Sequence, residues 1–100
     1  MIHVVAILTA KPGKGPQLLA ALSQVVPQVH AEQGCIEYQP VTDAESAGPS
    51  QDKIGPDSLV VIEKWETIDD LRAHSASAHM AEFGKAAADL IAGKTVHVLD

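Results

Sequence analysis

The chain carries its most informative residues in one stretch, LVVIEKWETIDDLRAHSASAH (residues 59–79). Residues 59–66 are rich in β-branched side chains and predict a strand whose end holds the only tryptophan. Thr67 then suits a helix N-cap, because acidic residues follow it. His74 and His79 come next, so aromatic surface and proton-transfer groups are concentrated in one short region. We expect the functional site there.

The N-terminal part predicts a strand followed by an amphipathic helix. Residues 2–9 form an apolar strand with both parities hydrophobic, and such a strand is usually covered on both faces. The helix is predicted to begin at Pro16 and to end before Gly34, with Pro27 kinking it or weakening its hydrogen bonding. Its apolar stripe consists of Leu18, Leu22, Val25, Val26 and Val29.

The rest of the chain predicts two more strands and a further helix. Residues 35–41 and 94–99 have strand character, whereas residues 42–58 are polar, aperiodic and rich in turn-forming residues, which indicates a long mobile hairpin loop. A helix is expected to begin at Ser77 and to stop at Gly93. Its stripe consists of Met80, Phe83, Ala87, Leu90 and Ile91.

This order of elements defines the expected fold. Strand, helix, strand, strand, helices and strand describe a ferredoxin-like α+β sandwich, in which four mainly antiparallel strands carry helices on one face. A single domain spanning residues 1–100 is expected, because the chain has the length of one domain and neither a linker nor an internal repeat. The other face of the sheet would leave apolar side chains in water, so we expect a homodimer that packs sheet against sheet.

Composition narrows the possible partners and compartments. The net charge of −6 opposes a nucleic-acid backbone, and Lys and Arg form no cluster. A single cysteine, Cys35, cannot form an intrachain disulfide, and the N-terminus lacks a secretory signal. No apolar run approaches the roughly 20 residues that cross a bilayer. These features favour a soluble, cytoplasmic domain with no nucleic-acid or membrane partner.

Four motifs together resemble a known family. They are KPGK (residues 11–14), AEQGCIEY (residues 31–38), EKWE (residues 63–66) with Leu71 and His74, and finally Ser77, His79 and Phe83. In this order and spacing they are similar to the antibiotic biosynthesis monooxygenase domain, except across residues 42–58, where the family is usually shorter. The resemblance implies a dimeric ferredoxin-like α/β barrel with a ligand cavity between sheet and helices, and an activity toward quinols or aromatic polyketides that needs neither metal nor flavin.

Cofactor-free oxygenation requires a base, an apolar pocket and donors for a developing oxyanion, because O₂ reacts slowly with closed-shell molecules until the substrate is deprotonated. Histidine suits the base, since its unperturbed pKa is about 6.5. His74 lies three residues after Leu71 and should face the cavity, as general base or as a helix-capping residue. His79 is a weaker candidate for substrate binding. The two are five positions apart across an expected helix break, without a further ligand nearby, so no metal site is predicted.

Other candidate side chains have two possible roles each. Trp65 and Glu63 share one face of their strand. Trp65 could have a catalytic role as a wall of the substrate pocket, with its indole N–H as a donor, or it could belong to the core. Glu63 could be a carboxylate in the pocket, but the favoured alternative is a salt bridge at the dimer edge. Tyr38 could donate a hydrogen bond to the substrate or reach solvent. The apolar candidates for lining the substrate pocket are Leu71, Met80 and Phe83.

Related activities give the alternatives. The haem-degrading relatives carry an asparagine near the end of the first strand, where this chain has Ala6, so the resemblance disfavours haem degradation. An isomerase acting on a small phosphorylated sugar could use the same histidine and glutamate. A dimeric ligand-binding module without catalysis would retain the cavity alone. The resemblance implies a monooxygenase that acts on a quinol-like substrate with O₂ and requires no cofactor.

Overall fold

The computed structural model describes residues 1–100 and contains four strands and three helices. In chain order the elements are β1 (Ile2–Ala10), α1 (Gly15–His30), β2 (Cys35–Val41), β3 (Ser58–Trp65), α2 (Ile68–Ser75), α3 (Ala78–Ala87) and β4 (Ile91–Leu99). The strands form one sheet in the order β2-β3-β1-β4, and each neighbouring pair is antiparallel. The predicted ferredoxin-like α+β sandwich is confirmed.

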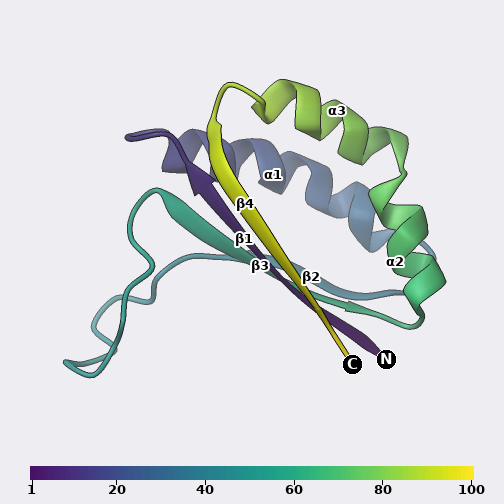
Figure 1. Cartoon of the computed structure of the whole chain (residues 1–100), viewed down its shortest axis with the longest axis horizontal. Coiled ribbons are helices and arrows are strands. Elements are labelled where there is room, and N and C mark those ends of the chain that lie inside the picture. The colour runs from purple at the N-terminus through teal and green to yellow at the C-terminus, as the bar shows by residue number, and fades with distance from the viewer.

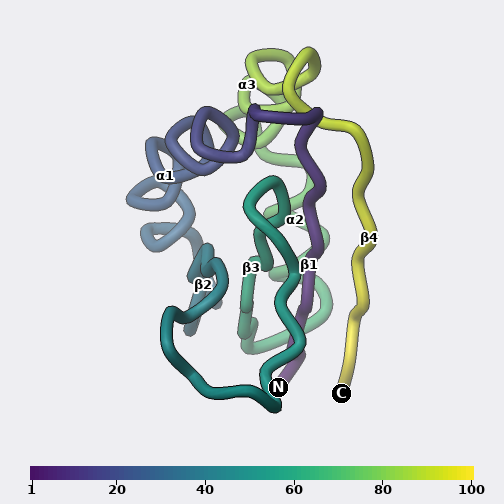
Figure 2. The backbone as a smooth tube through the Cα atoms, turned by 90° about the vertical axis from the view of Figure 1, so that its left-hand side faces the viewer, coloured from purple at the N-terminus to yellow at the C-terminus, as the bar shows by residue number.

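All three helices lie on the same face of the sheet (Figure 1). Figure 2 shows β4 at the outer edge beside β1, with the two chain termini close together at the ends of these strands. The loop between β2 and β3 extends from the opposite end of the sheet (Figure 1). The fold therefore leaves one sheet face without any helix and leaves β4 as an edge strand.

The core fills the space between α1 and the helix-facing side of β1 and β3. Alternate residues of each strand point inward because side chains in a strand alternate between faces. Burying each large apolar side chain contributes about 1.5–3 kcal/mol, so this layer dominates the stability of the fold. Its largest completely buried members are Trp65, Leu18, Leu22, Leu59, Val4, Val29 and Val61.

The start of α1 is held against the loop before β3 by a single carboxylate. Asp57 accepts hydrogen bonds from the backbone N–H of Gly13 and Gly15, both at 3.0 Å. These N–H groups precede or begin the helix and would otherwise lack partners. The close approach needs glycine at position 15, because a Cβ atom there would overlap the Pro56 carbonyl oxygen.

We therefore expect Gly15→Ala to lower the free energy of unfolding by about 1–3 kcal/mol, since overpacking against backbone atoms has no easy relief. Urea denaturation measures this change. Gly84→Ala is the matched control: it lies inside α3, and its new Cβ would meet no atom within 4 Å. The control should gain about 0.5–1 kcal/mol from the better helix propensity of alanine. Equal unfolding midpoints for Gly15→Ala and the wild-type protein would contradict the predicted overlap.

Two predicted features near the helices differ in the structure. The helix predicted to begin at Ser77 and to stop at Gly93 ends at Ala87, so Leu90 and Ile91 are not helical. Gly93 does not end a helix; it lies within β4, opposite Thr9. Strand pairing is favoured over helix at this position, because β-branched Ile91 pairs with Ala10 and extends the sheet.

Helix α1 continues through Pro27, which lies on the exposed side where water can reach the carbonyl group that loses its partner. The helix is continuous, and the kink or weakened hydrogen bonding expected at Pro27 remains a prediction.

The long loop at residues 42–57 is anchored at its base and is not disordered throughout. Asp43 accepts hydrogen bonds from the backbone N–H of Ile54 and Gly55, both at 2.9 Å. These two bonds hold the pKa of the Asp43 carboxyl below its ordinary value. The loop therefore closes on itself near the sheet, and mobility remains a prediction only for its tip.

Candidate active site

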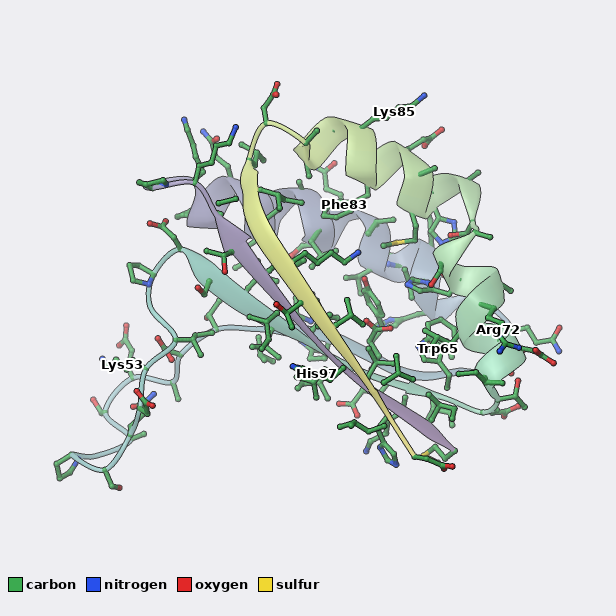
Figure 3. The ribbon with its side chains drawn as sticks, viewed as in Figure 1. Lys53, Trp65, Arg72, Phe83, Lys85 and His97 are labelled. Carbon is green, nitrogen blue, oxygen red and sulfur yellow. The ribbon has the colours of Figure 1, made fainter.

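A cavity of about 260 Å³ lies between the sheet and the helices α2 and α3. Most of its lining is apolar and includes Leu71, Met80 and Phe83, the three apolar candidates of the sequence analysis. Figure 3 shows Phe83 pointing from α3 toward the sheet, whereas Arg72 and Lys85 point away from the interior. The polar side chains on the cavity wall are those of Tyr38, Glu63, His74, Ser75 and Lys94.

His74 reaches this cavity because α2 begins at a well-formed cap. The Thr67 side chain accepts a hydrogen bond from the Asp70 backbone N–H at 3.1 Å, which fixes the start of the helix. His74 follows on the inner side and is only 5% exposed. Its ring contacts those of Tyr38 and Trp65 in tilted arrangements, with centroid distances of 5.3 and 4.8 Å. The predicted cavity-facing position of His74 is therefore what the structure shows.

The two ring nitrogens of His74 have different surroundings. Nδ1 lies 2.8 Å from Oε2 of Glu32. Because a carboxylate oxygen can only accept, Nδ1 carries a hydrogen and donates a hydrogen bond to it. Nε2 makes no hydrogen bond within the chain, although every completely buried side-chain nitrogen or oxygen has a partner. Nε2 is thus not fully enclosed, and His74 is one of the residues that line the cavity. The arrangement leaves a lone pair available to a bound molecule.

Glu32 is the important residue that the sequence did not single out. It follows α1 and comes from a position 42 residues before His74, so no local spacing connects the two side chains. The same oxygen, Oε2, also accepts from Nε2 of His79 at 2.8 Å. The side chain of His79, predicted to bind substrate, does not line this cavity and turns toward Glu32.

Trp65 and Glu63 do share one face, as their parity predicted, but they differ in depth. The Trp65 indole N–H donates to Oε1 of Glu63 at 2.9 Å, and Trp65 is completely buried without lining the cavity. Trp65 is therefore core beneath His74 and not a cavity wall; Figure 3 places it beside α2. Glu63 lines the cavity and is only 6% exposed, so the structure places its carboxyl group at the pocket, whereas the predicted salt bridge at a dimer edge remains a prediction.

Burial shapes the acid–base properties of two cavity residues. Desolvation raises the pKa of Glu63, although the Trp65 hydrogen bond and the electrostatic interactions with His74 and Lys94 oppose that rise. Desolvation and the neighbouring carboxylates of Glu63 and Glu32 raise the pKa of Tyr38 well above its ordinary value of 10. Tyr38 consequently stays protonated and can donate a hydrogen bond into the cavity.

The fold and this cavity define a ferredoxin-like α+β domain with an internal pocket, and comparison with known proteins identifies the family. The model of the antibiotic biosynthesis monooxygenase family matches residues 1–86. An Escherichia coli K12 protein named "Probable quinol monooxygenase YgiN" is 38% identical over 88 residues, covering 86% of this chain and 84% of its own. The chain belongs to the antibiotic biosynthesis monooxygenase family.

Solved structures confirm the fold. PA3566 from Pseudomonas aeruginosa aligns with a TM-score of 0.82 at 23% identity, covering 98% of this chain and 90% of its own. A Nitrosomonas europaea structure aligns with a TM-score of 0.84 at 20% identity, over 100% of this chain and 97% of its own. None of the three helices has the length and apolar content that would be needed to cross a membrane.

Proposed function

We propose that the protein is a monooxygenase that oxidises a small quinol-like aromatic with O₂ in this cavity, with His74 as general base. The observation that carries the proposal is the pairing of an apolar cavity with a histidine nitrogen that is open to it and oriented from behind by Glu32. Family membership and the 38% identical relative named as a quinol monooxygenase support the same reaction class.

The cavity favours a small substrate. Its volume of about 260 Å³ lies below the roughly 300–1,000 Å³ typical of ligand pockets, so one or two fused rings fit better than a long polyketide. The asparagine position of the haem-degrading relatives is Ala6, which lines the cavity without any polar group. Both features favour a compact aromatic over haem.

The proposed chemistry assigns one task to each polar side chain. Nε2 of His74 takes a phenolic proton, and the resulting quinolate transfers an electron to O₂, which then bonds to a ring carbon. Tyr38 donates to the developing oxyanion, and the carboxyl oxygen of Glu63 that Trp65 leaves free holds the second hydroxyl group. Loss of water from the ring hydroperoxide, with removal of the proton on the same carbon, gives a hydroxyquinone. One oxygen atom enters the product and the other leaves as water, so the reaction balances.

Oxygen uptake by the metal-stripped protein tests this proposal. The substrates are small reduced quinols, from one ring to two fused rings, and each rate is compared with autoxidation in buffer. We expect uptake with formation of the hydroxylated quinone, identified by mass spectrometry with incorporation of label from ¹⁸O₂. Quinol binding without oxygen uptake would instead indicate a ligand-binding module, and turnover of a phosphorylated sugar would indicate an isomerase.

We also propose that the protein forms a homodimer through the helix-free face of its sheet. The apolar residues on this face have no cover within the chain; they are Val5, Ile7, Val41, Val60, Ile62 and Leu99. Leu99 is 51% exposed, and patches of this kind mark protein interfaces. His97 lies on the same face (Figure 3), so the patch has a polar rim at β4.

Light scattering at micromolar concentration is expected to give the mass of a dimer. Ile62→Glu should shift the mass to that of a monomer, because it places a charge at the centre of the apolar face. Glu82→Gln, on the exposed surface of α3, serves as the control and should remain dimeric. A monomeric wild-type protein would refute this assembly.

A further inference from the structure

Three potential metal ligands meet behind the cavity, where α2, α3 and the segment after α1 converge. Oε2 of Glu32 lies 2.8 Å from Nδ1 of His74 and 2.8 Å from Nε2 of His79, and the three atoms all lie within 4.8 Å of one another. Neither Glu32 nor His79 lines the cavity. The cluster is therefore a separate feature that shares only the ring of His74 with the candidate active site.

The donor set suits a particular class of ion. Imidazole nitrogen and carboxylate oxygen are the usual ligands of Zn²⁺ outside cysteine-rich sites, and two histidines with one carboxylate leave a position for water. The side chains of His74, Glu32 and His79 are only 6%, 14% and 18% exposed, so the carboxylate charge is poorly solvated and attracts a cation.

The geometry requires little rearrangement. Zn²⁺ binds these ligands at about 2.0–2.2 Å, which places ligand atoms roughly 3.4 Å apart around a tetrahedral ion. Opening each hydrogen-bonded contact of 2.8 Å to that spacing needs a shift of about 0.6 Å, and bringing the two histidine nitrogens, which lie within 4.8 Å of each other, to the same spacing needs at most about 1.4 Å. An ion can enter from outside, because His79 also lines a surface hollow of about 230 Å³ together with Gln24, Gln28 and Glu82.

We propose that Glu32, His74 and His79 form a binding site for a divalent ion of the Zn²⁺ type, distinct from the substrate cavity. The ion replaces the two hydrogen bonds to Glu32 and joins the segment after α1 to the two neighbouring helices α2 and α3, whose histidines follow Glu32 by 42 and 47 residues. Ser77 accompanies the site: its hydroxyl donates to the His74 carbonyl oxygen at 2.7 Å and lies 3.3 Å from Nε2 of His79. It fixes the turn between α2, which carries His74, and α3, which carries His79.

A consequence follows for His74, and it rests on the proposed function. Without the ion, the proton on Nδ1 leaves Nε2 as an acceptor facing the cavity. Binding the ion through Nδ1 moves the remaining proton to Nε2, so the cavity then faces a donor in place of a base. Occupation of the site should therefore suppress the oxygenase activity without blocking the cavity.

The test titrates Zn²⁺ alone into untagged, metal-stripped protein by isothermal calorimetry, with Co²⁺ absorption as an independent probe of coordination. We expect a single ion per chain and a tetrahedral Co²⁺ spectrum. Glu32→Gln and His79→Gln should each weaken Zn²⁺ binding by at least about 100-fold, more than the roughly 10–100-fold cost of losing an outer-shell partner. Glu82→Gln removes a nearby exposed carboxylate that is outside the cluster and should bind as the wild-type protein does.

The Co²⁺ spectrum of the wild-type protein tests the proposed metal site even if a variant fails to fold. An octahedral spectrum, or Zn²⁺ affinity that is unchanged in Glu32→Gln and His79→Gln, would overturn the proposed site. It would indicate that the ion binds to histidines on the surface instead. Loss of quinol-dependent oxygen uptake on adding Zn²⁺, with uptake retained in His79→Gln, would support the coupling to His74. If the metal-free protein shows no uptake at all, the proposed function fails while the calorimetric result still stands.

Discussion

Replacement of His74 by alanine is expected to lower kcat for quinol oxidation by about 10²- to 10⁴-fold, the usual contribution of a general base. The structure gives the reason: Nε2 is the accessible basic nitrogen on the cavity wall, and Glu32 fixes its orientation through Nδ1. Steady-state oxygen uptake at saturating quinol measures the effect. Added imidazole should restore part of the activity, because the deletion leaves room for a small base beside the substrate.

Arg72→Ala is the matched control for this variant. Arg72 lies on the same helix, two residues earlier, but its side chain points outward and pairs with exposed Asp69. Its replacement should leave kcat unchanged within about twofold, a difference of less than 1 kcal/mol. If His74→Ala instead raises KM and leaves kcat intact, His74 contributes to binding and another group takes the proton.

Periodic apolar patterns predicted the strands, helix α1 and the cavity-facing side of α2, because each depends on local spacing. His74 was placed correctly for this reason: a position three residues after Leu71 shares its helix face. Glu32 could not be found in this way. It interacts across 42 residues of chain, and a single acidic residue after a helix has no periodic pattern to distinguish it.

How deeply a side chain is buried, and where it points, was harder to predict than the face of the helix or strand on which it lies. Parity placed Trp65 beside Glu63, yet only packing of α2 over the end of β3 decides that Trp65 is buried beneath His74 while Glu63 reaches the cavity. His79 precedes the cavity-lining Met80 by one residue. The turn between α2 and α3 aims its side chain at Glu32, and that turn depends on tertiary contacts that local spacing does not encode.

Replacing Trp65 by alanine should lower the free energy of unfolding by about 3–5 kcal/mol, the range for deleting a large aromatic from a core. That loss is a large share of the roughly 5–15 kcal/mol stability of a typical domain. Trp65 is completely buried, stacks on His74 and supplies the hydrogen bond to buried Glu63, so truncation leaves a cavity and an unpaired carboxyl group. Chemical denaturation followed by circular dichroism measures the change, because the variant lacks the only tryptophan.

Two further variants separate the packing of Trp65 from its hydrogen bond. Trp65→Phe keeps most of the ring but removes the donor, which should cost about 1–3 kcal/mol and raise the pKa of Glu63 further, since the indole N–H now lowers it. Combining Trp65→Phe with Glu63→Leu should recover much of this loss, because no polar group is then left unpaired. A double variant as unstable as the sum of the two single variants would show that the hydrogen bond is not the source. Activity decides the role of the indole: a core residue predicts that Trp65→Phe retains kcat within about tenfold, whereas a larger loss would restore the catalytic role first predicted for it.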